Sequence, residues 1–153
     1  MTQFETFHAS AISIIHTALF YSKEEEYILT LQSISGQNLI DSSIVFPDNF
    51  IFSKNGAWEV VFDLASNAPN GTPFQAPAKG AVSALQVVKS VERMILDHYT
   101  EFKSGMYLFW PETEKLENIY KLLLRRLVGQ GFTVEYGFEP YRRGYVLRTP
   151  RCY

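Results

Sequence analysis

Apolar positions recur in two rhythms along the first half of the chain, one typical of helices and one typical of strands. Between residues 4 and 20 the apolar side chains are spaced by three and four, which predicts a helix over 4–20. Residues 27–34 and 58–64 have the β-branched and aromatic composition of strands. In the second strand Trp58 and every second residue after it share one face, and Glu59 lies on the other.

Turn signals divide the segment between these two predicted strands. Two short apolar runs, 44–46 and 50–52, are separated by Pro47 and its polar neighbours. The pair Asn55-Gly56 is the strongest short-range signal for a hairpin. Farther on, residues 66–78 contain three prolines and no periodicity. No helix or central strand is therefore expected to run through 66–78.

The second half of the chain alternates long helical patterns with short strands. One apolar stripe at helical spacing predicts a helix over residues 80–102. The apolar run 106–110 predicts a central strand that is buried on both faces. Thr113 is placed to cap a further helix with a leucine-rich face, which is expected to end at Gly129 or Gly131.

Two strands, 132–136 and 145–148, are expected to close the fold as a hairpin. The order of elements predicts an α+β fold, in which a mostly antiparallel sheet is flanked by helices. The length of 153 residues fits a single layered domain, 1–153. A hydrophobic content of 46% and a charged content of 20% are ordinary for a soluble globular chain.

Cysteine and histidine usage limits the chemistry that the sequence predicts. The single cysteine, Cys152, cannot form an internal disulfide, so nothing requires an oxidising compartment. The apolar stretch 10–20 is too short to span a bilayer and lacks the preceding cations of a signal peptide. These observations predict a cytoplasmic protein with no membrane partner. No metal site is expected, because His8, His16 and His98 are far apart in the sequence.

Charge is unevenly distributed, although the net charge is only −2. Residues 1–70 hold two cations against eight acids, whereas the residues from Lys121 onward hold seven cations against two acids. Arg142, Arg143 and Tyr145 combine charge and aromatic surface at the predicted turn of the closing hairpin. They predict contact with an anionic partner, either an acidic protein surface or a nucleic acid. The alternative interpretation is a solvated turn.

From about Trp58 to Thr149 the order of elements resembles that of the GNAT N-acetyltransferase family. In that family a central strand leads into a loop that cradles phosphates and then into a long helix. A strand, a second helix carrying a tyrosine and a closing hairpin follow. The corresponding segments here are 58–64, the loop through Gln75 and Ala81, the helix after it, 106–110, the helix with Tyr120, and the hairpin that begins at Gly131-Phe132. The order also resembles small phage proteins that are degenerate members of this fold.

The resemblance implies transfer of an acyl group from an acyl-CoA, such as acetyl-CoA, to an amine. It implies that the tyrosine, Tyr120, is the general acid that returns a proton to the leaving thiolate. Glu59 and Asp63 share one strand face, where one of them is expected to act as general base. The alternative for that face is contact with solvent, as on one side of many antiparallel sheets.

The loop before the long helix is the part that the resemblance assigns to the cofactor. Its residues Gln75, Lys79, Gly80 and Ala81 are the predicted pyrophosphate-binding residues of acyl-CoA. The spacing departs from the family pattern, and Pro77 removes one backbone N–H donor.

A second interpretation follows from these departures. The chain is then a non-catalytic binding or inhibitor protein of the phage accessory type, which holds its partner with an aromatic and basic C-terminal surface. In that interpretation Tyr120 is an aromatic residue of the core.

Overall fold

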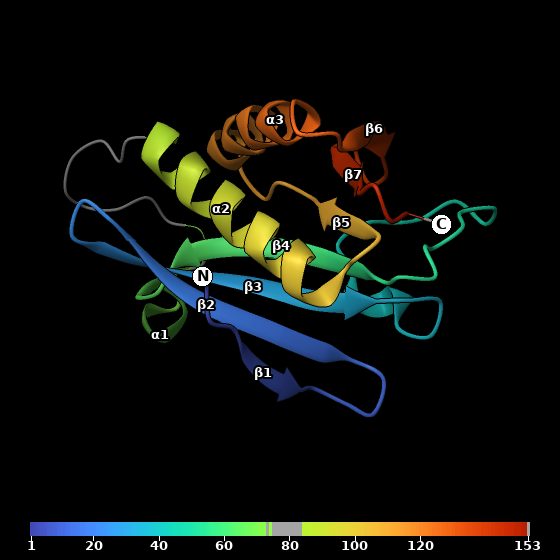
Figure 1. Ribbon diagram of the computed structural model, residues 1–153. Helices are drawn as coiled ribbons and strands as arrows, with labels where there is room; N and C mark the ends of the chain where they lie inside the picture. Colours follow the sequence, from blue (N-terminus) through green and yellow to red (C-terminus); the bar gives the residue numbers. More distant parts are fainter. Residues whose placement is uncertain (73, 75–83, 153) are drawn as a thin grey trace.

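Seven strands form one mixed sheet in the order β1-β2-β3-β4-β5-β7-β6 (Figure 1). The computed structural model describes residues 1–72, 74 and 84–152. The strands are β1 (Glu5–His8), β2 (Ile14–Ser22), β3 (Glu25–Ile34), β4 (Ala57–Leu64), β5 (Met106–Phe109), β6 (Thr133–Phe138) and β7 (Gly144–Arg148). The described helices are α1 (Asn67–Asn70), α2 (Ala84–Phe102) and α3 (Glu114–Val128), with a 3₁₀ turn at Leu39–Asp41. The predicted α+β class is confirmed.

The predicted helix over residues 4–20 is wrong, because these residues form β1 and most of β2. β2 pairs antiparallel with β3 through a two-residue connection. Lys23 and Glu24 in that connection have φ angles of 49° and 69°, as in the type I′ turn that matches the twist of a hairpin. The side chains of β2 that alternate toward the interior are His16, Ala18, Phe20 and Ser22. The alternation of buried and exposed side chains, which is typical of a strand, therefore decides the structure of this segment rather than the helical spacing of its apolar residues.

Strand β5 lies inside the sheet, as its apolar run predicts. All four of its residues are buried, and it pairs parallel with β4 and antiparallel with β7. The predicted closing hairpin is also confirmed as β6 and β7. Its second strand, β7, lies next to β5, so that β6 forms the edge of the sheet.

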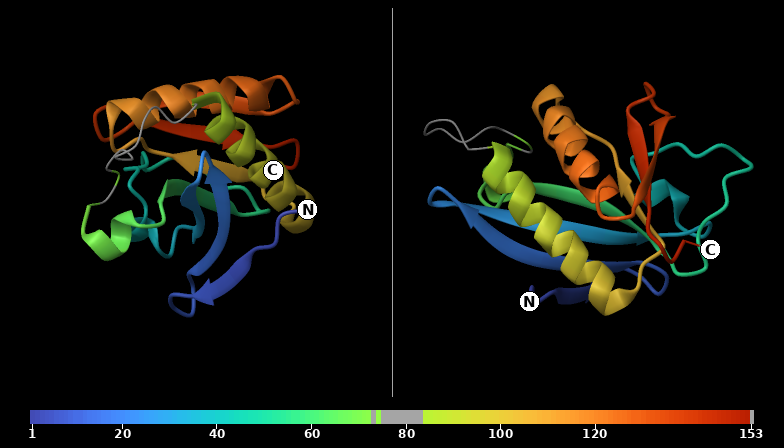
Figure 2. Two further views of the ribbon diagram at one scale, coloured as in Figure 1. Left: turned by 90° about the vertical axis from the view of Figure 1, so that its left-hand side faces the viewer. Right: turned by 45° about the horizontal axis from the view of Figure 1, so that its top comes forward.

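The two long helices, α2 and α3, cover the same face of the sheet (Figures 1 and 2). The sheet residues that share a core with them include Leu29, Leu31, Val60, Phe62, Tyr107, Phe109 and Leu147. Arg126 of α3 joins the helices, since its guanidinium donates to both carboxylate oxygens of Glu92 on α2 at 2.9 and 3.2 Å. The predicted helix over 80–102 is confirmed for residues 84–102, and residues 80–83 lie outside the described ranges. None of the helices in the described part of the chain is long and apolar enough to cross a bilayer.

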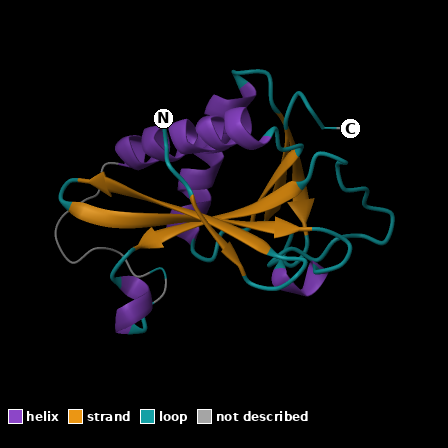
Figure 3. Ribbon diagram, turned by 60° about the horizontal axis from the view of Figure 1, so that its bottom comes forward, coloured by secondary structure: helices purple, strands orange, loops and turns teal. Residues whose placement is uncertain are grey.

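Residues 36–56 cover part of the opposite face, beneath β4, β5 and β7. The short apolar runs 44–46 and 50–52 do not form strands there, apart from one isolated bridge at Val45. Their phenylalanines Phe46, Phe50 and Phe52 pack into a cluster of tilted and edge-to-face rings with centroids 4.7 to 5.1 Å apart. The Asn55-Gly56 turn leads into β4 without a hairpin partner. Figure 3 shows the twist of the sheet and the loops gathered at one end of it.

The predicted N-terminal cap of α3 is present and gives a testable contribution to stability. The Thr113 hydroxyl oxygen accepts a hydrogen bond from the Leu116 N–H at 3.1 Å. Thr113→Ala is expected to lower the free energy of unfolding by about 1 kcal/mol, because one N–H of the first turn loses its partner. Urea denaturation measures the change.

Thr100→Ala is the matched control, because the hydroxyl of this exposed threonine bonds back to the Leu96 carbonyl within α2. That bond satisfies no N–H group at a helix end, so Thr100→Ala is expected to leave the free energy of unfolding unchanged or slightly raised. An equal loss of stability in both variants would show that the cap contributes nothing specific.

Candidate functional site

The parallel strands β4 and β5 diverge toward their carboxyl ends. They pair at only three positions, the last being Glu59 opposite Leu108. β4 nevertheless continues to Leu64 in its pairing with β3. Beyond Glu59 and Leu108 the facing backbone groups of the two strands are not paired with each other, so they can bind a ligand. The opening between β4 and β5 is therefore the candidate site, and Tyr120 and three carboxylates are close to it.

The ring of Tyr120, on α3, lies between the two diverging strands. Its centroid is 5.7 Å from that of Phe62 on β4 and 5.3 Å from that of Phe109 on β5. The side chain is 0% exposed, and its hydroxyl has no hydrogen-bond partner within the described residues. Burial raises the pKa of this hydroxyl well above its usual value, and the nearby Glu112 raises it further. A buried tyrosine hydroxyl normally has a partner, so a hydroxyl that finds none in the described residues is an exception.

Glu112 follows β5 after Trp110 and Pro111, and it is close enough to Tyr120 to raise the pKa of its hydroxyl. One of its carboxylate oxygens, Oε2, is buried and accepts no hydrogen bond from the part of the chain that the structure describes. Burial raises the pKa of Glu112 to about 7, and the negative charges of Glu59 and Asp63 act in the same direction. Arg143 offsets part of this effect. A carboxyl group with a pKa near neutrality can both accept and release a proton at physiological pH.

Glu59 is buried rather than facing solvent, so the solvent alternative for its strand face is wrong at this position. Its oxygens accept from the backbone N–H of Ser43 at 3.2 and 3.0 Å, and one also accepts from the hydroxyl of Ser42. Burial raises the pKa of Glu59, and these hydrogen bonds lower it in part. Glu59 therefore holds the segment after the 3₁₀ turn against the sheet, and its oxygens are already occupied.

Asp63 has a comparable structural task at the end of β4. One oxygen accepts from the backbone N–H of Leu64 at 2.8 Å and from the amide of Asn67 at 2.6 Å. The other accepts from the N–H of Phe74 at 2.9 Å. The carboxylate thus fixes the chain where it leaves the sheet and turns into α1. Among the three acids, Glu112 is the one with a buried oxygen and no partner for it in the described residues.

The three residues predicted to contact a partner differ in how far their side chains are exposed to solvent. The side chain of Arg142 is 85% exposed and lies 3.9 Å from Glu139. Arg143 is only 30% exposed, with its guanidinium 5.3 Å from the Trp110 ring centroid and 3.8 Å from Glu117. Tyr145 is buried in the core beneath the helices. Of the three, Arg142 alone projects fully into solvent, and Arg143 borders the opening beside Glu112.

The predicted cofactor residues Gln75, Lys79, Gly80 and Ala81 lie outside the described residues. No group of three or more histidine, cysteine or carboxylate side chains that could hold a metal is present in residues 1–72, 74 and 84–152.

Two histidines that are far apart in the sequence are in contact in the core. His16 Nδ1 lies 2.8 Å from His98 Nε2, and His98 Nδ1 lies 2.8 Å from the hydroxyl of Tyr107. The ring of Trp58 stacks on His16 at a centroid distance of 4.4 Å. Burial lowers the pKa of His98 to about 3, and the neighbouring His16 lowers it further. The pair was missed because the two histidines are 82 residues apart and because the predicted helix over 4–20 placed His16 on the wrong kind of element.

Glu112 is the residue of the opening that no sequence motif singles out. The signal was available in the sequence, since Glu112 follows a fully apolar strand and a proline. An acid at the carboxyl end of a central strand is placed where ligands of such sheets bind. Its missing hydrogen-bond partner, in contrast, is visible only in three dimensions.

Comparison with protein-family models, with curated proteins and with solved structures finds no match to this chain.

Proposed function

We propose that the opening between β4 and β5 is an acyl-transfer site, at which this GNAT-like chain moves an acyl group from an acyl-CoA to an amine. The observation that carries the proposal is Glu112, a carboxyl group with a pKa of about 7 and a buried oxygen that finds no partner in the described residues. It lies where two parallel strands diverge, and the unpaired hydroxyl of Tyr120 is close enough for the two groups to influence each other.

The order of elements supports the same reaction class. Strand β4, helix α2, strand β5, helix α3 with its tyrosine and the β6–β7 hairpin follow one another as the family resemblance implies. This support is architectural, and architecture alone does not fix chemistry. The Tyr120 hydroxyl and Glu112 Oε2, which find no partner in the described residues, supply the chemical support for the reaction.

The proposed step assigns one proton transfer to each of these two groups. Glu112 accepts a proton from the attacking amine as its nitrogen forms a bond to the thioester carbonyl carbon. The carbon–sulfur bond then breaks, and the sulfur leaves as a thiolate that takes the proton of the Tyr120 hydroxyl. Net proton transfer from Glu112 to Tyr120 restores both groups. Glu59 supports the β4 side through its bonds to Ser42 and Ser43 and takes no proton in this scheme.

Acetyl-CoA is expected to raise the melting temperature of the protein, because a ligand that binds only the native state stabilises it. At about 100 times the dissociation constant the gain is about 2.7 kcal/mol. For a chain of this size each kcal/mol corresponds to roughly 2–4 °C. Differential scanning fluorimetry with increasing acetyl-CoA measures the shift, with acetyl phosphate as the control ligand that lacks the nucleotide.

Lys79→Glu tests the predicted pyrophosphate loop in the same assay. Reversing this charge is expected to abolish the shift, because a carboxylate repels the pyrophosphate. If acetyl-CoA leaves the melting temperature of the unmodified protein unchanged, the acyltransferase proposal fails. The non-catalytic binding protein then becomes the better interpretation.

A further inference from the structure

The edge of the sheet at β2 is only half covered. β1 pairs with β2 from His8 opposite Ile14 to Glu5 opposite Thr17 and then ends. β2 itself continues to Ser22, and no other strand in residues 1–72, 74 and 84–152 pairs with it on that side. The last part of β2, 18–22, is therefore an open edge.

The segment before β1 turns away from this edge and crosses to α2. The backbone N–H and the hydroxyl of Thr2 both donate to Asp97 Oδ2 on α2, at 2.8 and 2.6 Å. Because of this contact, residues 2–4 run from β1 to α2 and close one end of the groove between β2 and α2. The result is a groove that is closed at one end by the crossing segment and bounded along its length by a strand edge and a helix.

The backbone groups that face the open edge follow from the pairing of β1. Successive residues of a strand direct their N–H and C=O groups to alternate sides. The Ala9 N–H donates to the Ser13 carbonyl at 3.0 Å, so Ser13 and every second residue after it face β1. By this alternation Leu19 and Tyr21 each direct one N–H and one C=O to the side where β1 is missing. Unpaired strand edges of this kind are templates for another strand.

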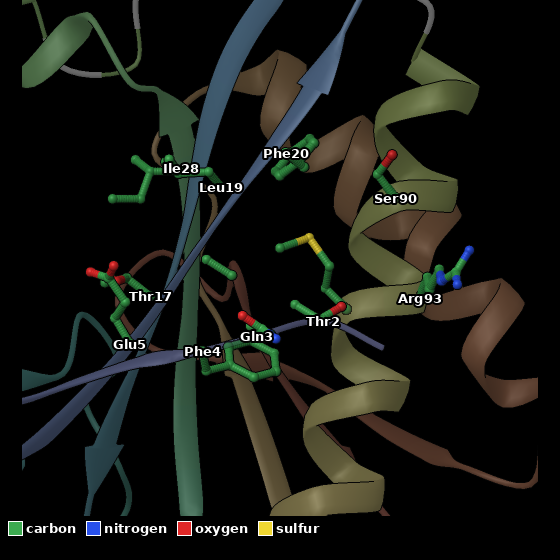
Figure 4. A pocket seen from close by; sticks show the side chains of 12 residues that line it. Thr2, Gln3, Phe4, Glu5, Thr17, Leu19, Phe20, Ile28, Ser90 and Arg93 are labelled. Atoms are coloured by element: carbon green, nitrogen blue, oxygen red, sulfur yellow. The ribbon is translucent and has the colours of Figure 1, made fainter.

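The groove beside this edge has a cavity volume of about 680 Å³. Figure 4 shows its walls, with Phe20 projecting from β2, Ser90 and Arg93 from α2, and Phe4 from the crossing segment. Met94 adds a further apolar surface. The volume lies within the roughly 300–1,000 Å³ that is typical of ligand pockets. It can therefore receive side chains in addition to a pairing backbone.

Charge on α2 distinguishes between the possible occupants. Arg93 lines the groove, and Lys89 lies one turn before it on the same exposed helix face. Asp97, one turn after Arg93, carries its negative charge at the end that Thr2 closes, and the acid that lines the groove, Glu5, lies at the β1 end. The exposed side of α2 beside residues 18–22 therefore carries two cations, Lys89 and Arg93, whereas the acids near the groove lie at its other end.

A second copy of this chain is the less suitable occupant. Two β2 edges joined antiparallel by a twofold axis would place both copies of α2 on the same face of the joined sheet. The basic faces around Arg93 would then oppose each other, and juxtaposed like charges disfavour association.

We propose that this groove binds an extended acidic peptide segment, which adds a strand to the β2 edge. The peptide backbone pairs with Leu19 and Tyr21, an apolar side chain contacts Phe20 and Met94, and an acidic side chain faces Arg93. Main-chain hydrogen bonds supply affinity in this mode of recognition, and alternate side chains supply specificity. The proposal is independent of the acyl-transfer site, which lies at β4 and β5.

The probe is a fluorescent, acetylated and amidated peptide of about six alternating valine and glutamate residues, the length of a typical strand. Saturable binding, followed by fluorescence anisotropy, is the expected result. The same peptide with N-methyl groups on alternate residues has no N–H donors on one edge and is expected to bind at least about tenfold more weakly. This comparison uses the unmodified protein, so no folding defect can imitate it.

Two variants at Leu19 separate the backbone from the side chain. Leu19→Pro removes the outward N–H, a change that edge strands tolerate, and is expected to weaken binding at least about tenfold. Leu19→Thr keeps the N–H and is expected to bind within about twofold of the parent, because the peptide pairs with the backbone. Arg93→Glu is expected to reverse the preference between the glutamate peptide and its lysine counterpart.

Three results would overturn the proposal. These are equal binding of the N-methylated peptide, equal binding by Leu19→Pro, and absence of binding to the unmodified protein with no change in hydrogen exchange at Leu19 and Tyr21. A dimer in sedimentation that Leu19→Pro dissociates would show that a second copy occupies the edge instead.

Discussion

Replacing Glu112 by glutamine is expected to lower kcat/KM for acetyl transfer to an amine by about 10²–10⁴-fold, the usual contribution of a general base. The pH dependence follows from the pKa of about 7. Because only the ionised carboxylate accepts a proton, kcat/KM of the parent protein is expected to rise as the pH increases through about 7. The glutamine variant should lose the inflection near pH 7 and keep only the rise that comes from deprotonation of the amine substrate. Release of free CoA in the presence of a panel of primary amines measures both quantities.

Glu114→Gln is the matched control, since this exposed carboxylate lies two residues farther along in the first turn of α3. It should keep the activity and the pH profile of the parent protein. A loss of activity that is equal in both variants would remove Glu112 from the proposed mechanism.

Stability provides a second measurement for Glu112 that does not depend on catalysis. The pKa of Glu112 is raised in the folded state, so its contribution to stability is complete below the unfolded value and is lost as the pH rises through about 7. Glu112→Gln should therefore raise the melting temperature above about pH 8 and have a smaller effect near pH 5. The opposite order would mean that the carboxylate is not held in a buried environment.

Acidification from about pH 7 to pH 4 is expected to cost on the order of 3 kcal/mol of folding stability through His98 alone. The pKa of His98 is lowered by burial to about 3, whereas the unfolded chain takes up its proton near 6.5. For a histidine with a depressed pKa, stability is complete above the unfolded value and is lost as the pH falls toward the folded value. The slope in that window approaches about 1.4 kcal/mol per pH unit.

Denaturant unfolding at several pH values measures this slope, and His98→Asn should lack its share of it. The exposed His8 supplies the control, because His8→Gln should retain the slope of the parent protein. The ring proton shifts of His98 in an NMR titration give a direct test. A midpoint near 6.5 for this ring would contradict the prediction.

The sequence predicted the elements whose local patterns agree with their final environment. The apolar run at β5, the stripe of α2 and the Thr113 cap of α3 are read from neighbouring residues, and each is found where expected. The helix over 4–20 failed because two kinds of spacing coexist there. The connection between β2 and β3, Lys23-Glu24, lacks the glycine or asparagine that usually marks a type I′ turn, so the sequence carried no hairpin signal there.

The candidate site was predicted in part. Tyr120 and Glu59 were selected from motif and strand face, and the structure places both near the opening. What could not be read from the sequence is which oxygens are already occupied. The bonds from Ser42 and Ser43 to Glu59, and the lack of a partner for Glu112 Oε2 among the described residues, depend on segments that meet only after folding.

The position of β7 between β5 and β6 determines the order in which the sheet can be completed. During synthesis β6 leaves the ribosome before β7, yet its neighbour in the sheet is β7. Until β7 arrives, β5 keeps an exposed edge of apolar residues, and β6 has no strand to join. A ribosome that stalls after β6 would thus hold a chain with one unpaired strand, β6, and one open sheet edge, at β5, a state prone to aggregate and a natural substrate for chaperones.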